Sequence, residues 1–390
     1  MDLKRAFGAL TIAAFVALAS PADAQRGRRA PPAAPSVAQH VTIMDADSGA
    51  ILACDDCNTP IPPASMSKLM TVLVVLELLR SGDITLDTQY TVSEYAWREH
   101  GAPSGGSHMF LPINSQVSVR DLLRGAIIVS ANDACVVLAE GIAGSEAAFV
   151  EIMNRRAREL GLTTANFTNA TGVDDPGHRI SSADLARLAR HFITTFPRSY
   201  GVYAEREFTF NNRTQQNRNP LLGAFDGADG VKTGHTDESG YGLVGSAIVD
   251  GERRIIVFNG TRSMADRRSE AIRLMRSAFS DYAVRTLAAA GAEVGEAEVW
   301  LGGRRTVSLV AQSDILIGGR RGVQSTLTAN IVYDGPLHPP IAEGDVVAHL
   351  VVEGPGFEPQ SFPLTAGRSV GKANWFSRAW EGLRLTFFGP

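Results

Sequence analysis

Pro63-Ala64-Ser65-Met66-Ser67-Lys68-Leu69-Met70-Thr71 opens an apolar segment that continues to Leu79 and ends at Gly82. A helix of this sequence is apolar nearly all round, which is typical of a helix buried inside its domain. Ser65 and Lys68 are three residues apart, so a helix places them on the same face. A Ser-x-x-Lys pattern alone is weak, because it also occurs by chance at Ser369 to Lys372. The stretch therefore predicts a buried helix that carries a candidate nucleophile.

Two further motifs follow in order along the chain, Ser130-Ala131-Asn132 and Lys232-Thr233-Gly234. Each is short enough to arise by chance. All three in this order, with spacers long enough to build a domain, form a specific pattern. The pattern predicts a serine nucleophile beside a polar second wall and a third wall on the edge of a β-strand.

The first motif has the chemistry of an activated serine. A serine hydroxyl attacks poorly until a neighbouring base removes its proton, and Lys68 lies within reach of Ser65. A lysine serves as that base only if burial and nearby positive charge lower its pKa. Leu69 and Met70 beside it are consistent with burial. The alternative is that Ser65 only caps the helix and Lys68 is a surface charge.

The second motif lies in a short link between two apolar helices. The Ser130 hydroxyl could relay a proton between Lys68 and a leaving amine, and the Asn132 amide could bond the lysine and the substrate backbone. The alternative is that Ser130 or Asn132 merely caps the following helix.

The third motif lies on a predicted strand. Lys232 and Thr233 could donate to a carboxylate, and Gly234 would let a substrate approach the strand closely. The backbone N–H of His235 could complete an oxyanion hole with the N–H of Ser65. We do not expect the His235 side chain to act as a base.

The segments around these motifs predict a mixed α/β domain over residues 38–290, with an antiparallel sheet and a helical cluster. Val41 to Met44 and Ile51 to Ala53 flank an Asp-Ser-Gly turn and predict a hairpin. The other predicted strands are 231–234, 242–249 and 254–259, and the predicted helices are 119–129 (opened by a capping box at Ser118), 133–143, 146–160, 182–195 and 269–290.

Beyond Gly291 the pattern changes to short apolar runs separated by Gly-Gly, Asp-Gly and Pro-rich turns. The runs are residues 298–301, 306–310, 326–332 and 346–352. They predict an all-β domain over residues 291–368, a sandwich by default. No cluster of catalytic residue types occurs in them, so a structural or partner-binding role is expected.

The two ends of the chain suggest export and membrane association. Lys4 and Arg5 precede an apolar run and an Ala22-Asp23-Ala24 cleavage site, which predicts a signal peptide over residues 1–24. Residues 25–37 predict a disordered lead-in. In residues 369–390 one helix face would carry Phe376, Ala379, Trp380, Leu383 and Phe387. That face suits a membrane interface, and the alternative is a helix docked on its own domain.

Composition excludes several other classes of protein. The formal net charge is −4 and there is no basic run, so no nucleic-acid partner is expected. No metal site is expected, because too few ligands cluster. Cys54 and Cys57 could form a local disulfide, a redox pair or two free thiols, and Cys135 is expected in the core.

The chain resembles the serine-type D-alanyl-D-alanine carboxypeptidases, the low-molecular-mass penicillin-binding proteins, from His40 to the C-terminus. The resemblance extends beyond the three triplets to the residues around them and to three further stretches. These residues are 63–71, Ser130-Ala131-Asn132-Asp133-Ala134-Cys135, Asn169-Ala170-Thr171-Gly172, Asn217-Arg218-Asn219 before Leu221-Leu222, and 230–236. Ala131 departs from the family's more usual glycine, and the Cys54 and Cys57 pair has no family role to assign.

The resemblance implies a transpeptidase- and β-lactamase-like fold and removal of the terminal D-alanine from peptidoglycan stem peptides through an acyl-enzyme. Penicillins would acylate the same serine, and the enzyme would act in cell-wall remodelling and cell-shape control. Carried over, Ser65, Lys68 and Ser130 are catalytic, whereas Asn132, Lys232, Thr233 and Gly234 bind substrate. Arg267 matches the arginine that binds the terminal carboxylate, with Arg268 as the fallback. No cofactor is implied, and the expected location is the periplasm, at the outer face of the cytoplasmic membrane.

Three other functions are compatible with parts of this pattern. A β-lactamase shares the motif order, but its Glu-x-x-Leu-Asn stretch has only a poor match at Glu159 to Thr163, which lacks the asparagine. A D,D-endopeptidase of peptidoglycan crosslinks would use the same site. A non-catalytic peptidoglycan-binding protein is disfavoured, because all the reactive residues are intact.

Overall fold

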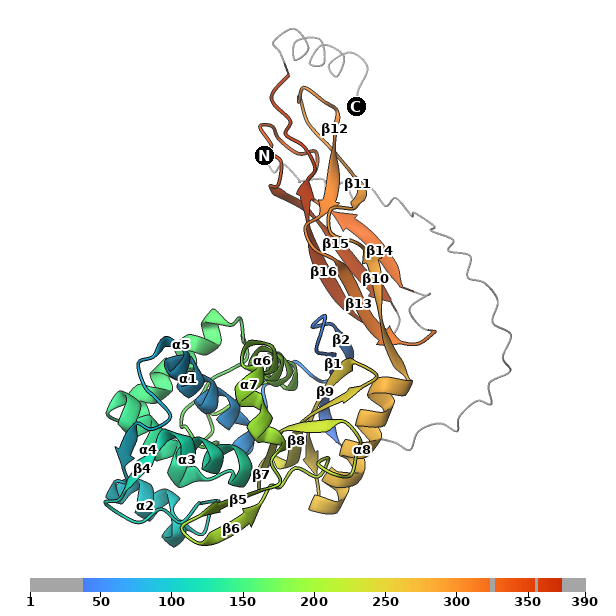
Figure 1. Cartoon of the computed structure of the whole chain (residues 1–390). Coiled ribbons are helices and arrows are strands. Elements are labelled where there is room, and N and C mark those ends of the chain that lie inside the picture. The colour runs from blue at the N-terminus through green and yellow to red at the C-terminus, as the bar shows by residue number, and fades with distance from the viewer. Residues whose placement is uncertain (1–37, 323–326, 355–356, 374–390) are drawn as a thin grey trace, which may run out of the picture. The chain divides into compact units, whose positions relative to one another are not determined.

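The computed structural model describes residues 38–322, 327–354 and 357–373 (Figure 1). The chain divides into two compact units between Ala283 and Val284. This division precedes the boundary predicted at 290/291.

The N-terminal unit is built on a five-stranded antiparallel sheet in the order β2-β1-β9-β8-β7. Its strands are β1 (Gln39–Asp45), β2 (Ile51–Asp55), β7 (Ala228–Thr236), β8 (Gly240–Val249) and β9 (Glu252–Thr261). The predicted hairpin is confirmed, since Ile43 pairs with Ala53. Because β7 is an edge strand, its third-motif residues border the space beside the sheet.

Helices cover both faces of this sheet. The helix α8 packs on β8 and β9, and α6 packs on β1 and β9. Figure 1 shows α8 on one side and the helical cluster on the other. The helices are α1 (Lys68–Ser81), α2 (Glu94–His100), α3 (Val119–Arg124), α4 (Asn132–Ala143), α5 (Glu146–Glu159), α6 (Ser182–Thr195), α7 (Pro197–Tyr200) and α8 (Met264–Ser280). Short elements complete the unit: η1 (Ala64–Ser67), η2 (Ala102–Ser104), η3 (Gly125–Val129), η4 (Gly201–Ala204), β3 (Gln89–Thr91), β4 (Gln116–Ser118), β5 (Glu207–Phe210) and β6 (Arg213–Gln216).

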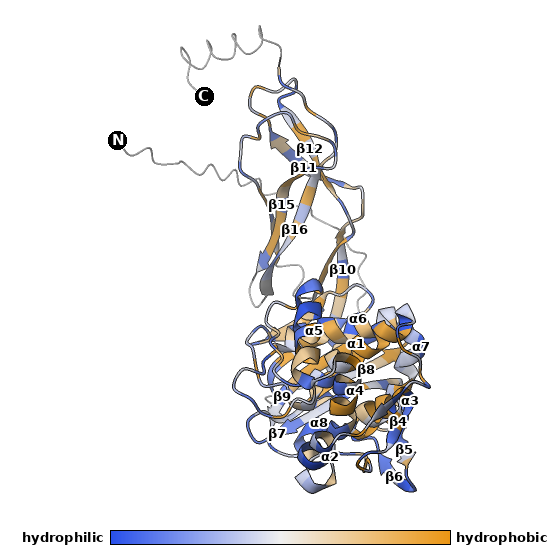
Figure 2. Cartoon of the chain, turned by 90° about the vertical axis from the view of Figure 1, so that its left-hand side faces the viewer, coloured by the Kyte–Doolittle hydropathy of each residue, from blue (hydrophilic) through white to orange (hydrophobic). Residues whose placement is uncertain are grey.

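The helix α1 is the central helix of this unit, as its apolar sequence predicts. All of its residues from Lys68 to Leu76 are buried, and Figure 2 shows it as strongly hydrophobic. It ends at Gly82, which adopts the left-handed conformation that glycine tolerates best. A helix buried in this way holds its first turn rigidly; Lys68 is its first residue, and Ser65 lies in η1 directly before it.

The segment before Ser130 winds unusually. The Ser118 side chain accepts a hydrogen bond from the Asp121 N–H, as the predicted capping box requires. The helix then passes into one π-helical turn, η3, and stops at Ser130, whose φ is 64°. The left-handed backbone at Ser130 ends this helical segment just before α4 begins at Asn132.

The C-terminal unit is all-β. A five-stranded antiparallel sheet runs in the order β11-β12-β16-β15-β14, and β10 pairs with β13. The strands are β10 (Tyr282–Ala288), β11 (Glu293–Glu298), β12 (Thr306–Ala311), β13 (Ile315–Arg320), β14 (Thr328–Val332), β15 (Val346–Gly354) and β16 (Phe357–Ala366). Ile315 and Ile317 of β13 share one core with Leu309 and Leu350 of the larger sheet, so the two sheets pack as a sandwich.

Several predicted elements in this region are wrong. The helix predicted over 269–290 ends at Ser280, because residues 282–288 form β10 and pair with β13. The strand predicted over 298–301 is only partly correct: Glu298 ends β11 and Val299 forms an isolated bridge with Leu337, whereas residues 300 and 301 form a turn. The strands β13 and β16 were not predicted, since Gly318 and Gly319 interrupt the first and Pro359 and Pro363 interrupt the second.

The structure also decides between the cysteine alternatives. Cys54 and Cys57 form a disulfide at the end of β2, and Cys135 is a buried free thiol. Within the described residues, none of the helices is both long and apolar enough to cross a bilayer. The predicted signal peptide, the lead-in and most of the predicted tail helix lie outside the described residues.

Candidate active site

Ser65 lies in η1, the tight turn that leads directly into α1. The preceding Ala64 adopts a φ of 48°, in the left-handed region that L-residues rarely occupy. Backbone strain of this kind clusters at functional sites. Ser65 is only partly buried, whereas its neighbours Ala64 and Met66 are fully buried. The turn therefore presents the serine hydroxyl to solvent from a rigid base.

Lys68 is fully buried next to Ser65. Its Nζ donates to Ser65 Oγ at 2.8 Å, to Asn132 Oδ1 at 2.7 Å and to the carbonyl oxygen of Thr171. Burial lowers the pKa of Lys68 to about 8, and the positive charge of Arg218 lowers it further, against the opposing effects of Cys135 and Asp133. The predicted pair is thus in contact, and the lysine can lose its proton near neutral pH.

Ser130 and Asn132 lie on the second wall, as predicted. Asn132 begins α4 and contacts Lys68 through its amide oxygen. Ser130 is buried, and its Oγ has no hydrogen-bond partner within the part of the chain that the structure describes. A buried hydroxyl without a partner is costly, so such a group is expected to have a role with a bound molecule.

Lys232 and Thr233 are buried on β7. Lys232 Nζ donates to the Thr233 carbonyl at 3.1 Å. Burial and then the nearby charge of Lys68 hold the pKa of Lys232 well below its usual value. Two lysines with depressed pKa values therefore share one site, and both are desolvated.

Gly234 lies against the turn that carries Ser65. A Cβ at this position would lie 2.8 Å from the Pro63 carbonyl oxygen and 3.0 Å from Met66 Cγ. These atoms belong to η1 and to the residue before it, so the missing side chain lets β7 pack against the turn that carries Ser65. Packing against the nucleophile's own turn is thus one reason for glycine at this position, and the expectation that Gly234 lets a substrate approach closely stays a prediction.

Arg267 and His235 both lie beside Tyr241. Arg267 is buried in α8, its Nη1 donates to the Gly234 carbonyl at 3.4 Å, and burial lowers its pKa to about 10. Arg268, the fallback, is exposed. The exposed His235 ring stacks on Tyr241 with centroids 3.8 Å apart. The structure therefore favours Arg267 over Arg268 and gives the His235 side chain no contact with Ser65.

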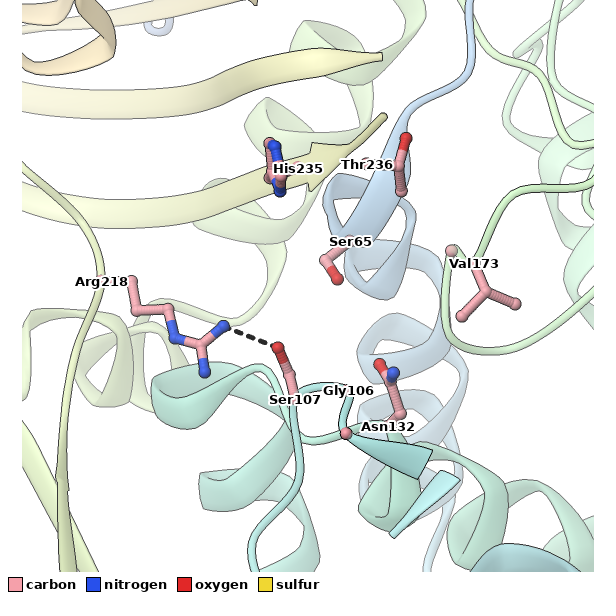
Figure 3. A pocket seen from close by; sticks show the side chains of 10 residues that line it. Ser65, Gly106, Ser107, Asn132, Val173, Arg218, His235 and Thr236 are labelled. Carbon is pink, nitrogen blue, oxygen red and sulfur yellow. Dashed lines mark hydrogen bonds between the residues drawn. The ribbon is translucent and has the colours of Figure 1, made fainter. Parts of the chain in front are cut away.

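A pocket of about 380 Å³ opens above Ser65 (Figure 3). Its lining includes predicted residues together with others to which no role was assigned. The lining residues are Ser65, Gly105, Gly106, Ser107, Asn132, Gly172, Val173, Arg218, His235 and Thr236. Arg218 reaches across the pocket, and its Nη1 donates to Ser107 Oγ at 2.6 Å. The stretches that contain Gly172 and Arg218 were part of the resemblance, whereas nothing in the sequence singled out Gly105 to Ser107.

The sequence profile described as D-alanyl-D-alanine carboxypeptidase matches residues 28–262, which include all three motifs. The chain belongs to this family. A second profile, the penicillin-binding protein 5 C-terminal domain, matches residues 282–372. The carboxypeptidase DacA of Haemophilus influenzae is 38% identical over 396 residues, covering 99% of both chains. DacC of Escherichia coli is 36% identical over 359 residues, 91% of this chain and 90% of the relative.

Solved structures agree with this assignment. Penicillin-binding protein 5 from Haemophilus influenzae superposes with a TM-score of 0.72 at 38% identity, over 87% of this chain and 99% of that one. Penicillin-binding protein D2 from Listeria monocytogenes, solved with ampicillin bound, gives 0.55 at 29% identity, over 64% of this chain and all of that one. The chain is thus a D-alanyl-D-alanine carboxypeptidase of the serine hydrolase type, with a penicillin-binding-protein fold.

The β-lactamase alternative gains no support from the site. Glu159, the nearest match to the deacylating glutamate of those enzymes, ends α5 and pairs with Arg156 at 2.8 Å. It is exposed and is not among the residues that line the carboxypeptidase pocket.

Proposed function

We propose that this carboxypeptidase removes the terminal D-alanine of peptidoglycan stem peptides through an acyl-enzyme on Ser65. The observation that carries the proposal is the 2.8 Å contact between Lys68 Nζ and Ser65 Oγ inside a desolvated site. A buried amine with a pKa of about 8 is available as a base near neutral pH.

Acylation follows from this contact. Neutral Lys68 takes the hydroxyl proton of Ser65 as Oγ bonds to the carbonyl carbon of the penultimate D-alanine. The oxyanion is held by the backbone N–H groups of Ser65 and His235. As the amide bond breaks, Ser130 gives its hydroxyl proton to the leaving nitrogen and takes the proton held by Lys68, so free D-alanine departs and Lys68 is neutral again.

Deacylation uses the same groups. Water attacks the ester carbon, Lys68 accepts a proton from that water, and Ser65 Oγ recovers a proton as the ester bond breaks. The shortened peptide is released with a new carboxylate, and the enzyme is regenerated.

The remaining residues of the three motifs hold the substrate. Lys232, Thr233 and Arg267 provide donors for the terminal carboxylate, and Asn132 bonds the peptide backbone. Gly234 contributes indirectly, because it allows β7 to lie against η1. β-Lactams would acylate Ser65 in place of the peptide, a role supported by the ampicillin complex of the Listeria monocytogenes relative.

The location of the enzyme follows from its two ends. The signal-peptide pattern of residues 1–24 directs the chain to the periplasm, and the amphipathic pattern of residues 369–390 attaches it to the outer face of the cytoplasmic membrane. There it would trim stem peptides, limit their crosslinking and so influence cell shape.

Mass spectrometry tests the proposal. The mature protein is mixed with diacetyl-Lys-D-Ala-D-Ala or with penicillin. Release of D-alanine and a penicilloyl adduct on Ser65, both lost in Ser65→Ala, are expected. Penicillin hydrolysis without D-alanine release, or an adduct elsewhere, would overturn the proposal.

A further inference from the structure

The backbone of Asn169 to Gly172 lies against α1 behind the nucleophile. The Thr171 carbonyl accepts a hydrogen bond from Lys68 Nζ, and the Ala170 carbonyl accepts one from Thr71 Oγ1 at 2.7 Å. Lys68 and Thr71 are three residues apart on α1, so they lie on one face. Two consecutive carbonyls are therefore bonded by two side chains of the helix that carries the general base.

Glu146 holds the same segment from the opposite side. Its Oε1 accepts the Ala170 N–H at 2.9 Å, and its Oε2 accepts the Tyr95 hydroxyl at 3.1 Å. The Tyr95 hydroxyl in turn lies 3.2 Å from His100 Nε2. Both backbone groups of Ala170 are thus engaged, and the carboxylate that engages the N–H is itself oriented by Tyr95.

We propose that Glu146 is a positioning residue for Lys68, acting through Ala170 and the Thr171 carbonyl. This inference rests on the proposed function of Lys68 as the base. Glu146 does not line the pocket and contacts neither Ser65 nor Lys68 by any hydrogen bond among the described residues. Its effect on the reaction is transmitted by one backbone segment, which decides where the third acceptor for Lys68 Nζ lies.

The carbonyl contact has a predictable effect on the titration of Lys68. A carbonyl oxygen stabilises the protonated amine more than the neutral one, so losing the contact lowers the pKa of Lys68. Loss of the contact also leaves the amine less well directed at Ser65, which slows acylation. The charged and titratable groups that face Lys68 are Asp133 and Cys135 of α4, Lys232 of β7 and Arg218, with His100 and His178 interacting with it more weakly. A Glu146 variant alters none of these side chains directly. After burial, which has the larger effect on both groups, the Glu146 charge raises the pKa of His100 and of Cys135, so Glu146→Gln, which removes the charge alone, is the control for that effect.

Three substitutions of Glu146 separate the effect of its hydrogen-bond acceptor from the effect of its negative charge. Glu146→Gln keeps an acceptor oxygen at the same reach but removes the charge. Glu146→Asp keeps the charge but is shorter by one methylene, and Glu146→Ala removes both. The matched control is Glu151→Ala, an exposed glutamate on the same helix.

The test is the rate of Ser65 acylation by penicillin in the full mature chain, across a pH series that spans the pKa of Lys68. We expect Glu146→Gln and Glu151→Ala to stay within about threefold of the parent, and Glu146→Asp and Glu146→Ala to fall about tenfold or more. In the two slow variants the rising limb of the pH profile should move to lower pH. A purely structural role would reduce the active fraction, measured by adduct stoichiometry, without moving the limb.

The inference would be overturned if Glu146→Asp and Glu146→Ala had the acylation rate and the pH profile of the parent. It would also be overturned if their rate fell while the rising limb of the pH profile stayed in place. If Glu146→Ala does not fold, the pair of Gln and Asp variants decides. Failure of the parent protein to be acylated at Ser65 is a separate outcome, because it refutes the proposed function itself.

Discussion

Replacing Gly234 by alanine should destabilise the protein and slow its acylation together. The new Cβ would be 2.8 Å from the Pro63 carbonyl oxygen, 3.0 Å from Met66 Cγ and 3.2 Å from Ala64 Cβ. Because the nearest neighbour is backbone and not the end of a flexible side chain, either β7 or η1 must move by a few tenths of an ångström.

The size of both effects can be worked out from this geometry. Overpacking a close contact costs about 1–3 kcal/mol of unfolding free energy. In a unit of this size the melting temperature falls by roughly 2–4 °C per kcal/mol. Since η1 carries Ser65, the same displacement should slow acylation by about tenfold, in line with the ~100-fold loss for a shift of about 1 Å.

The assay pairs chemical or thermal unfolding with the rate of penicilloyl adduct formation, and Gly201→Ala serves as the control. Gly201 has no atom near its missing Cβ and does not have a positive φ, so alanine there should be neutral or slightly stabilising. If Gly234 instead served only substrate approach, alanine would slow acylation without loss of stability. That result, or unchanged stability and rate, would refute the packing explanation.

Three other perturbations give distinct outcomes. The acylation rate should rise with pH through about 8, because Lys68 must lose its proton to act as a base; a stopped-flow pH series measures the limb, and a flat profile would contradict that role. Ser130→Ala should leave the melting temperature nearly unchanged, since the hydroxyl has no partner among the described residues, while turnover of the D-Ala-D-Ala peptide falls about 10²–10⁴-fold; near-normal turnover would exclude proton relay. Replacing Cys54 and Cys57 by serine should cost about 1–2 kcal/mol, because so short a loop constrains the unfolded chain little, and should leave acylation intact; loss of acylation would assign the pair a part in the site.

Local sequence patterns are sufficient to predict the boundaries of helices whose ends carry capping residues. Ser118 and Gly82 mark helix boundaries by capping, and both were predicted. The prediction for residues 282–288 is wrong for the opposite reason, since no local signal ends the preceding helix before them. Their alanine-rich sequence continues a helical pattern, and only pairing with β13 makes them a strand.

The same distinction applies to the site. Ser65 and Lys68 are close in sequence, so their contact follows from helical spacing. Arg218 meets Ser107 across more than a hundred residues, and Glu146 meets Ala170 across the whole of α5 and the loop that follows it. Such meetings depend on the folded path of the chain. Arg218 and Ala170 stand in stretches that carry the resemblance, but no local pattern predicts which residues they contact, and none singles out Ser107 or Glu146. The close approach of Gly234 to η1 is likewise not predictable from the sequence, because only the fold shows what a glycine faces.

The burial of Lys68 and Lys232 in one site also links ligand binding to protons. Burial holds the pKa of both lysines below their usual values; the charge of Arg218 adds to this for both, and the charge of Lys68 adds to it for Lys232. A carboxylate arriving beside Lys232 supplies the missing counter-charge and draws its pKa back up. Association with an anionic peptide or a penicillin should therefore be accompanied by proton uptake from the medium, and affinity should weaken as the solution becomes more alkaline. The enzyme would then prefer ligands with an anionic chain end, because the site lacks a negative charge beside Lys232 and only such a ligand supplies one.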